Sequence, residues 1–309
     1  MSATATNETA EETVADERCA SCGTAGGNDV TLKNCNGCFL VKYCGVECQR
    51  NHRSEHKRAC KKRAAELKDE LLFKQPESTD LGDCPICQLP IPLERTQDER
   101  RYATYPCCSK VVCIGCMHAN LLREREERLA LSCPFCRRPV PKSKKEINLL
   151  IKKRAEANDP FALCSLGRDH SREGDCATAT QYWKKAALLG NIASHFQLAG
   201  AYYEGRDGVE KDMKKEIYHL EQAAIGGHVF ARHNLGVVEE QNGNIERAVK
   251  HFTIAANLGD DESMKELKEG YSRGVVSKED FEAALRAHKA VDAMKSPQRD
   301  EAEAALRMM

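Results

Sequence analysis

The sequence has little of what several protein classes need. It has one tryptophan, 6% aromatic residues and no net charge, because 47 Lys and Arg balance 47 Asp and Glu. This balance argues against a polybasic nucleic-acid binder of the histone type. The longest aliphatic run, residues 147–151, is interrupted by Asn148 and falls far short of the roughly 20 residues that a membrane-spanning helix needs. The first residues are small, polar and acidic, so we expect no signal peptide.

Cysteine is abundant instead, and its placement divides the chain. Of 17 cysteines, fifteen lie between Cys19 and Cys136, and only Cys164 and Cys176 follow. In a reducing compartment, clustered Cys-x-x-Cys pairs are metal ligands rather than disulfides. We therefore expect a metal-organised first half and a conventionally folded second half, in a protein of the cytoplasm, the nucleus or both. The two outlying cysteines are expected to be small apolar core residues.

The second half repeats one short pattern three times. The segments KAALLGN (185–191), QAAIGGH (222–228) and IAANLGD (254–260) share an Ala-Ala-x-x-Gly core, and their last glycines are 37 and 32 residues apart. Glycine is the residue that most often ends a helix in the left-handed conformation. Repeats of this length, with two helical segments each, predict a solenoid of helix pairs.

Residues 160–295 resemble the Sel-one-like repeats, a branch of the tetratricopeptide type. The resemblance is clearest in YWKKAALLG and AYYEGRDGVEKD. It implies a right-handed superhelix whose concave face holds a protein client, and it implies no catalysis. Trp183 is expected to lie in the core of the repeats.

The first cysteine cluster contains eight ligand-type residues within 42 positions: Cys19, Cys22, Cys35, Cys38, Cys44, Cys48, His56 and Cys60. This number suits two closed tetrahedral zinc sites. Four protein ligands on each zinc leave no position for water or substrate, so the metal is structural and its binding energy, about 10–16 kcal/mol per site, is folding energy. His52 competes for the histidine role, and the spacing to Cys60 favours His56.

The order of these residues, with YCGVECQ followed by HKRAC, resembles the MYND zinc finger. The resemblance implies that one zinc is held by Cys19, Cys22, Cys44 and Cys48. It implies that the other is held by Cys35, Cys38, His56 and Cys60. It further implies that short proline-containing peptides bind this finger. Arg53 stands where the family usually has a tryptophan.

The second cluster opens with CPIC and closes with CPFC, and its eight thiols also suit two zinc ions. They are Cys84, Cys87, Cys107, Cys108, Cys113, Cys116, Cys133 and Cys136. The adjacent Cys107 and Cys108 are unusual ligands for one metal, because neighbouring side chains tend to diverge. Whether this pair shares one zinc is left open by the sequence.

Residues 84–136 resemble a RING finger. The resemblance implies a cross-brace with Cys84, Cys87, Cys113 and Cys116 on one zinc and Cys107, Cys108, Cys133 and Cys136 on the other. It implies that Ile86, Pro134 and Arg137 contact a ubiquitin-conjugating enzyme, with Arg137 restraining ubiquitin through hydrogen bonds. RING ligases act by positioning, so no catalytic residue is expected. This sequence has no histidine ligand here, and Asn120 replaces the bulky hydrophobic residue of many active members.

The predicted fold is multi-domain, with two zinc-stabilised cross-brace fingers of short β-hairpins and a short helix, followed by an all-α solenoid of helix pairs. We expect about four zinc ions, two per finger. The predicted boundaries are a disordered acidic tail (1–18), a MYND-type finger (19–60), a helical linker (61–80), a RING-like finger (81–140), a linker helix (141–158), the repeats (159–295) and a tail (296–309).

Three functions remain open at this point. The leading hypothesis is a RING-type ubiquitin ligase, or a ligase subunit, whose MYND finger and repeats select the client. The second is a non-enzymatic adaptor in which fingers and repeats only bind proteins. The third is a nucleic-acid-associated regulator, based on seven Lys or Arg in residues 49–63. Fifteen thiolates with four Zn²⁺ would bring the formal charge to about −7, so this basic helix is better explained as charge compensation. We therefore expect protein partners, and neither nucleic acid nor a membrane.

Overall fold

The computed structural model describes residues 18–27, 29–93, 101–205, 209–292, 294 and 296–307. The predicted acidic tail lies outside the described residues except for Arg18. The chain folds as two compact units, the first ending at Leu72 and the second beginning at Phe73. No helix among the described residues is both long enough and apolar enough to cross a membrane.

The first unit is a small finger built on one hairpin and two helices. Strands β1 (Lys33–Asn34) and β2 (Lys42–Tyr43) pair antiparallel, with Lys33 opposite Tyr43. Helices α1 (Val46–Asn51) and α2 (Arg53–Leu72) follow. The cluster of buried apolar residues inside the finger is small and consists of Cys19, Cys35, Cys38 and Tyr43. A core of this size cannot stabilise a fold alone, so the cysteines must contribute through a bound metal. Helix α2 continues past the predicted end of the finger at residue 60.

The second unit begins with another finger of similar design. Strands β3 (Tyr102–Thr104) and β4 (Val111–Cys113) pair antiparallel and lead directly into helix α3 (Ile114–Glu126). Ile91 and Val112 are buried with Cys84, Cys113 and Cys116. Both fingers therefore have the predicted short hairpin and helix.

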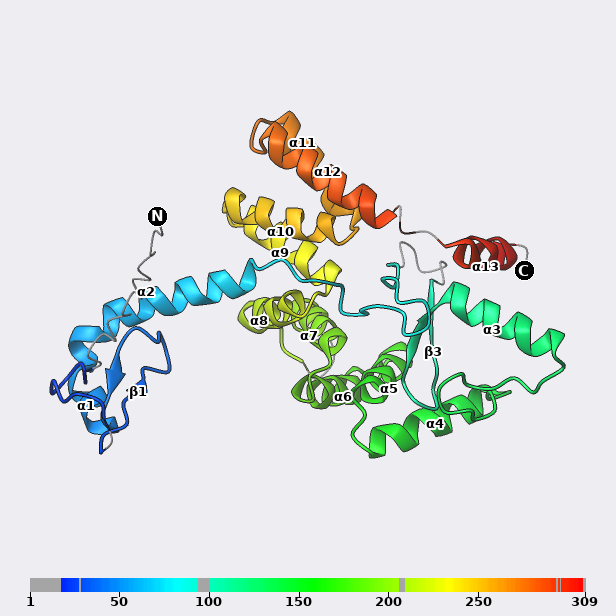
Figure 1. Ribbon diagram of the computed structural model, residues 1–309, viewed down its shortest axis with the longest axis horizontal. Helices are drawn as coiled ribbons and strands as arrows, with labels where there is room; N and C mark the ends of the chain where they lie inside the picture. Colours follow the sequence, from blue (N-terminus) through cyan, green and yellow to red (C-terminus); the bar gives the residue numbers. More distant parts are fainter. Residues whose placement is uncertain are drawn as a thin grey trace, which may run out of the picture. The chain divides into compact units, whose positions relative to one another are not determined.

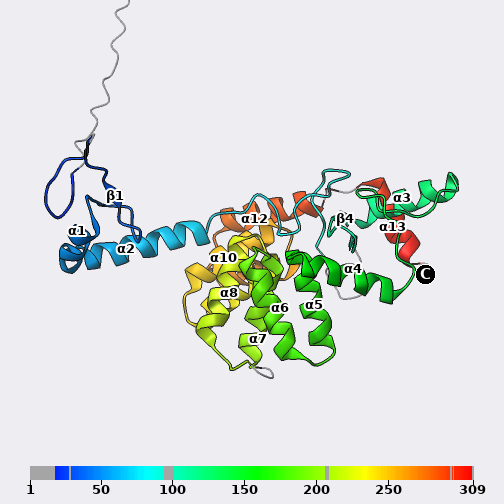
Figure 2. The ribbon, with the colours of Figure 1, turned by 90° about the horizontal axis from the view of Figure 1, so that it is seen from below.

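A linker helix, α4 (Lys144–Glu156), leads into four helix pairs, which stack side by side in Figures 1 and 2. The first helices of the pairs are α5 (Pro160–Arg172), α7 (Ile192–Glu204), α9 (Val229–Gln241) and α11 (Asp261–Ser272). The second helices are α6 (Cys176–Leu188), α8 (Met213–Ile225), α10 (Ile245–Asn257) and α12 (Lys278–Asp292). The predicted solenoid of helix pairs is thus confirmed.

The repeated Ala-Ala-x-x-Gly pattern forms the turn between one pair and the next. Gly190, Gly227 and Gly259 have φ of 85°, 89° and 96°, which only glycine adopts without strain. The residue after each glycine caps the next helix: Asn191 accepts a hydrogen bond from the Ser194 N–H, and His228 and Asp260 do the same three residues ahead.

Inside a pair, small and large side chains alternate at the crossing point of the two helices. Gly167 of α5 lies against the indole of Trp183 in α6, and Gly236 of α9 lies against the ring of Phe252 in α10. The same repeat positions in the second pair, α7 and α8, carry the buried Ala199 and Leu220. A glycine thus stands wherever its partner is an aromatic residue.

The segment that leads from Phe73 to the second finger lies along the repeats. The Phe73 ring packs on His251 at 4.8 Å between centroids, and the Arg247 guanidinium lies 4.8 Å from the same ring. Farther on, the Asp80 N–H donates to the Gly227 carbonyl at 3.2 Å. Residues 73–80 of the predicted helical linker are therefore not helical, and they contact α10 and the turn at Gly227.

The chain ends in a helix rather than in the expected tail. Helix α13 (Pro297–Arg307) begins after Ser296, whose hydroxyl accepts the Arg299 N–H, and it packs against α3 of the second finger. Both ribbon views place the two helices side by side (Figures 1 and 2). Residues separated by the whole repeat array thus meet at one finger.

Candidate metal centres

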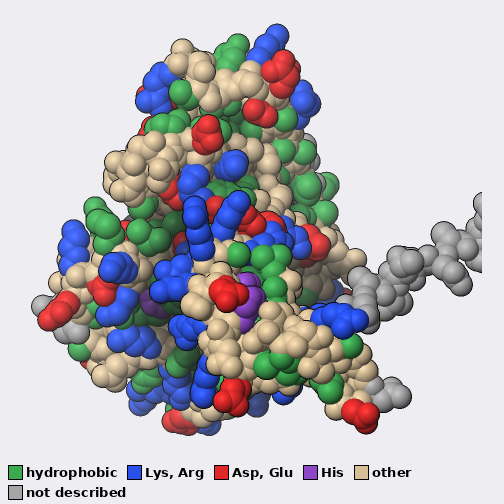
Figure 3. All heavy atoms as spheres, turned by 90° about the vertical axis from the view of Figure 1, so that its left-hand side faces the viewer, with side chains coloured by type: hydrophobic (Ala, Val, Ile, Leu, Met, Phe, Trp, Pro, Cys, Tyr) green, Lys and Arg blue, Asp and Glu red, His purple; other side chains and the backbone are tan. Residues whose placement is uncertain are grey.

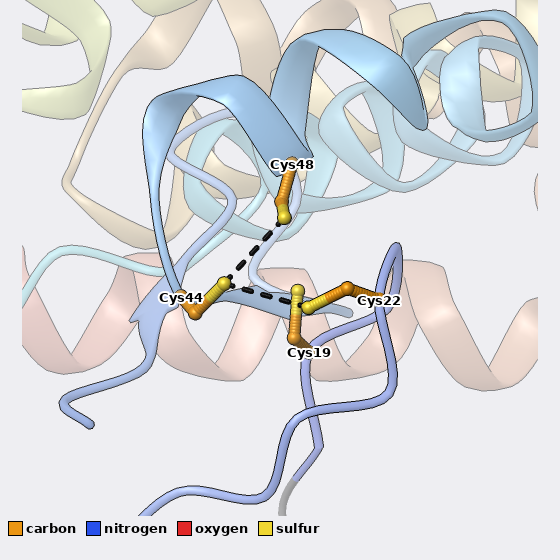
Figure 4. A group of neighbouring side chains, drawn as sticks. All are labelled: Cys19, Cys22, Cys44 and Cys48. Atoms are coloured by element: carbon orange, nitrogen blue, oxygen red, sulfur yellow. Dashed lines mark hydrogen bonds between the residues drawn. The ribbon is translucent and has the colours of Figure 1, made fainter. Parts of the chain in front are cut away.

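The first centre lies at the tip of the first finger. It joins Cys19 and Cys22, from the opening turn, to Cys44 after β2 and Cys48 on α1 (Figure 4). The Cys44 sulfur lies 3.6 Å from that of Cys22 and 3.5 Å from that of Cys48. A tetrahedron with Zn–S bonds of 2.3 Å has edges of about 3.8 Å, so this spacing fits a zinc ion.

The thiols of this centre differ in acidity. Hydrogen bonds from the backbone N–H groups of Cys22 and Cys44 lower the pKa of Cys19 to about 6. Hydrogen bonding with the Cys48, Cys22 and Cys19 side chains raises the pKa of Cys44 to about 12. The pKa of Cys22 is also lowered, by hydrogen bonds from Thr24, so two thiols of this centre ionise more readily than the other two.

The second centre of this finger combines a knuckle with helix α2. Cys35 and Cys38 meet His56 and Cys60, which lie four residues apart on one face of α2. The Cys38 sulfur is 3.1 Å from His56 Nε2, and the Cys35 and Cys60 sulfurs are 3.8 Å apart. A Cβ at Gly37 would lie 3.2 Å from the Cys60 sulfur, so a larger residue in the knuckle would crowd this ligand.

His52, the competing candidate, lies beside this centre but outside the ligand group. Its ring stacks on that of His56 at 5.7 Å, its Nδ1 lies 3.1 Å from the Tyr43 hydroxyl, and its Nε2 is 3.6 Å from Glu55. These contacts place His52 against the ring of His56, with its own nitrogens directed to Tyr43 and Glu55 rather than to the ligand group.

The second finger brings together Cys84, Cys87, Cys113 and Cys116 in one group. The Cys87 and Cys113 sulfurs are 3.8 Å apart, and the Cys113 N–H donates to the Cys84 sulfur at 3.4 Å. Burial would raise the pKa of Cys84, but backbone N–H groups of Cys87 and Cys113 bring it down to about 7. This thiol is thus prepared to bind metal as a thiolate.

The other group of this finger contains the adjacent Cys107 and Cys108, with Cys133 and Cys136. Sulfur distances are 3.4 Å between Cys107 and Cys136 and 3.6 Å between Cys108 and Cys133. The expected divergence of neighbouring side chains does not occur, because the backbone turns sharply here. Both the Cys108 and Ser109 N–H groups donate to the Tyr105 carbonyl, and Ser109 has φ of 56°.

The turn at Tyr105 has the backbone pattern of a cysteine knuckle. In the first finger, the Cys38 and Phe39 N–H groups donate in the same way to the Cys35 carbonyl, and Phe39 has φ of 58°. Tyr105 thus occupies the position of a first cysteine, and Cys107 supplies the missing sulfur from inside the turn. The sequence carried no signal for this arrangement beyond the adjacency itself.

In both fingers the ligand pairs alternate along the chain. The first and third pairs share one group, and the second and fourth share the other. The four groups are those implied by the two family resemblances. All ligand atoms within each group lie within 4.8 Å of one another. The fingers therefore fit several zinc ions, each held by four protein ligands and without an open position for chemistry.

The three residues expected to contact a conjugating enzyme lie on the surface of the second finger. Ile86, in the first knuckle, exposes 45% of its surface, and Pro134 and Arg137 of the last knuckle are exposed as well. Asn120 is half-buried on α3, and the exposed Leu122 lies two residues farther along the helix. Ile86, Pro134 and Arg137 are thus on the surface of the described part of this finger.

Sequence reasoning missed the residues that support the metal groups of this finger. Glu124 is buried and accepts hydrogen bonds from the Ser132 N–H and hydroxyl. Arg154 of α4 donates to the Ser109 hydroxyl and the Cys107 carbonyl, and it pairs with Asp159, the cap of α5. Arg299 of α13 reaches the first knuckle. Only the capping of α5 at Asp159 had a local signal.

Comparison with known proteins identifies two of the three parts. The model of the MYND finger matches residues 19–60. The model of the Sel1 repeat matches residues 161–191, 192–228 and 230–260. Residues 19–60 are a MYND finger, and residues 161–260 are Sel1 repeats. Neither of these two models covers the second finger, residues 81–140.

Curated relatives resemble only part of the chain. Cytochrome c oxidase assembly factor 7A of Xenopus laevis is 38% identical over 64 residues, which are 21% of this chain and 28% of that protein. Chitin synthase regulatory factor 4 of Schizosaccharomyces pombe is 29% identical over 86 residues, 28% of this chain and 14% of that protein. The chain thus spans less than a third of either relative.

A solved Sel1 repeat protein from Oxalobacter formigenes is 25% identical to this chain, with a TM-score of 0.43, and the match covers 56% of this chain and 71% of that one. The chain thus combines a MYND finger with Sel1 repeats, and its four ligand groups fit several zinc ions.

Proposed function

We propose that the protein is a RING-type ubiquitin ligase or ligase subunit. The observation that carries the proposal is the alternating arrangement of ligand pairs in the second finger, with α3 beginning within the third pair and ending before the fourth. A finger of this form needs no catalytic residue, because it accelerates transfer by holding a ubiquitin thioester in a reactive geometry. The exposed Ile86 and Pro134 supply an apolar contact for the conjugating enzyme, and Arg137 supplies hydrogen bonds to both proteins.

The MYND finger and the repeats would select the client. The MYND finger takes short proline-containing peptides, and the concave face of the repeats takes a folded or extended client. In this proposal the protein acts in the cytoplasm, the nucleus or both, where free thiols stay reduced. A client bound to the array is held by the same chain that recruits the conjugating enzyme, which raises its effective concentration.

The test is ubiquitin-chain formation by the full-length, zinc-loaded protein with a panel of conjugating enzymes, activating enzyme, ubiquitin and ATP. Ile86→Ala and Arg137→Ala should lower the rate about tenfold or more, as for residues at the centre of an interface. Leu188→Ala and Arg286→Ala are matched controls, because both side chains are exposed on the helix array. Activity that is unchanged in the two finger variants would refute the assignment of the contact residues.

A non-enzymatic adaptor is the second candidate, and the names of the two relatives favour it, since one is an assembly factor and the other a regulatory factor. In that case no conjugating enzyme of the panel would give chains with fully zinc-loaded protein. Both fingers would then serve only to bind protein partners.

The basic helix offers a third, weaker candidate. Lys and Arg side chains gather on the face shown in Figure 3, and the exposed Arg50, Arg53, Lys57 and Lys61 lie along α1 and α2. Nucleic-acid binding through these groups would weaken steeply with salt. Absence of such binding at low salt would remove this candidate.

A further inference from the structure

Helix α13 fits against the second finger at one point where the two backbones almost touch. A Cβ at Gly115 of α3 would lie 2.7 Å from the Arg299 nitrogen and 2.8 Å from the Gln298 carbonyl carbon. On the same face of α13, Ala302 is completely buried. Only a glycine on α3 and small side chains on α13 permit this approach.

At the contact, Arg299 is turned into the finger and is only 6% exposed. Its Nη2 donates to the Cys87 sulfur at 3.6 Å and to the Leu89 carbonyl at 3.3 Å, and its Nη1 donates to the Met294 carbonyl at 3.5 Å. No carboxylate of the described residues lies within ion-pair distance of its guanidinium. Among the described residues, the anionic groups that it meets are the sulfurs of two zinc ligands, Cys87 and Cys113.

A buried guanidinium without a counter-charge is strongly unfavourable. A centre of four thiolates and one Zn²⁺ has a formal charge of −2, so the loaded centre of Cys84, Cys87, Cys113 and Cys116 supplies that counter-charge. Partners that donate hydrogen bonds to a metal's ligands fix the orientation of those ligands and strengthen metal binding.

We propose that α13 stabilises zinc binding at this metal centre. In this proposal Arg299 is a positioning residue that holds the zinc-bound Cys87 and the knuckle behind it. Docking of α13 and retention of this one zinc are then coupled, and each favours the other to the same extent. The proposal concerns the chain's own metal centre and stands whether or not the finger recruits a conjugating enzyme.

The experiment uses the full-length, zinc-loaded protein and measures zinc release to the coloured chelator 4-(2-pyridylazo)resorcinol. With Arg299→Gln, one of the four zinc ions should leave roughly 10–100-fold faster than in the unaltered protein, while the other three keep their rates. Gly115→Ala should give the same single fast phase through the other partner of the contact, and hydrogen exchange of residues 297–307 should increase. Arg286→Gln, on the exposed face of α12, is the matched control.

The Arg299→Lys variant and a spectroscopic signal distinguish the effect of the Arg299 charge on zinc retention from the effect of its packing. Arg299→Lys should restore slow zinc release in part, and one ¹¹³Cd resonance of the cadmium-substituted protein should shift in Arg299→Gln and return toward its place in Arg299→Lys. Zinc release from Arg299→Gln at the rate of the unaltered protein would overturn the proposal. So would a lysine variant that loses zinc as fast as the glutamine variant.

Discussion

The packing between Gly167 and Trp183 predicts that Gly167→Ala lowers the free energy of unfolding, although alanine is the better helix former. In Gly167→Ala the new Cβ would lie 2.4 Å from the indole Nε1 and 2.5 Å from Cδ1 of Trp183. Such overpacking costs about 1–3 kcal/mol. Replacing glycine by alanine inside a helix raises the free energy of unfolding by up to about 1 kcal/mol through helix propensity. We therefore expect a net loss of about 1–2 kcal/mol in the free energy of unfolding.

A matched substitution isolates the packing effect. Gly200 also lies inside a helix, α7, and nothing stands within 4 Å of a Cβ there. Gly200→Ala should therefore stabilise the protein by about 0.5–1 kcal/mol. Urea unfolding followed by fluorescence is suited to the comparison, because Trp183 is the only tryptophan and reports on the first helix pair.

The second helix pair, α7 and α8, suggests a second substitution that should restore the stability lost in Gly167→Ala. Combining Gly167→Ala with Trp183→Leu copies the Ala199 and Leu220 combination, so the two changes together should cost less than the sum of their separate effects, by about 1 kcal/mol or more. The double variant is followed by circular dichroism, because it lacks the tryptophan. If Gly167→Ala raised stability as Gly200→Ala does, the packing argument would be wrong.

Two further predictions concern acid and metal. Burial lowers the pKa of His228 to about 4, so the folded state resists its protonation, and stability should fall by about 3 kcal/mol as the pH drops from 6.5 to 4. His228→Asn, which copies the Asn191 cap of the preceding pair, should flatten that part of the stability profile in thermal unfolding, and an unchanged slope would contradict the assignment. Prolonged chelation should remove about four zinc ions and unfold both fingers, while most of the helical circular dichroism of the Sel1 array remains. Loss of the helical signal together with the metal would show that the array does not fold independently of the fingers.

Local patterns in the sequence predicted much of this architecture. The Ala-Ala-x-x-Gly turns fix the ends of helices through glycine geometry, so the helix pairs follow from a few residues such as Gly190 and Asn191. The number of clustered ligands suited two zinc ions per finger, because a zinc site is formed from short knuckles with strong local signatures. The family resemblances implied the four groups that the structure assembles.

The features that were missed are long-range. Residues 296–309 were expected to be a tail, because the sequence of a short charged helix does not indicate which surface the helix covers. The burial of Ala302 and Arg299 is explained only by their contact with α3 at Gly115. The packing of Phe73 on His251 and the hydrogen bond of Asp80 to Gly227 are of the same kind. Such contacts carry no periodicity, since each depends on one pair of distant positions.

The meeting of Gly115 with Arg299 also sets an order of events during synthesis. The two residues are separated by 184 positions, and at 5–20 residues per second a ribosome needs about 10–40 s to make that stretch. All eight thiols of the second finger are present in the nascent chain before Arg299 has been added. The finger can therefore take up zinc while its α13 face is still uncovered, whereas the contact between α13 and α3 forms only after the last repeat has been made.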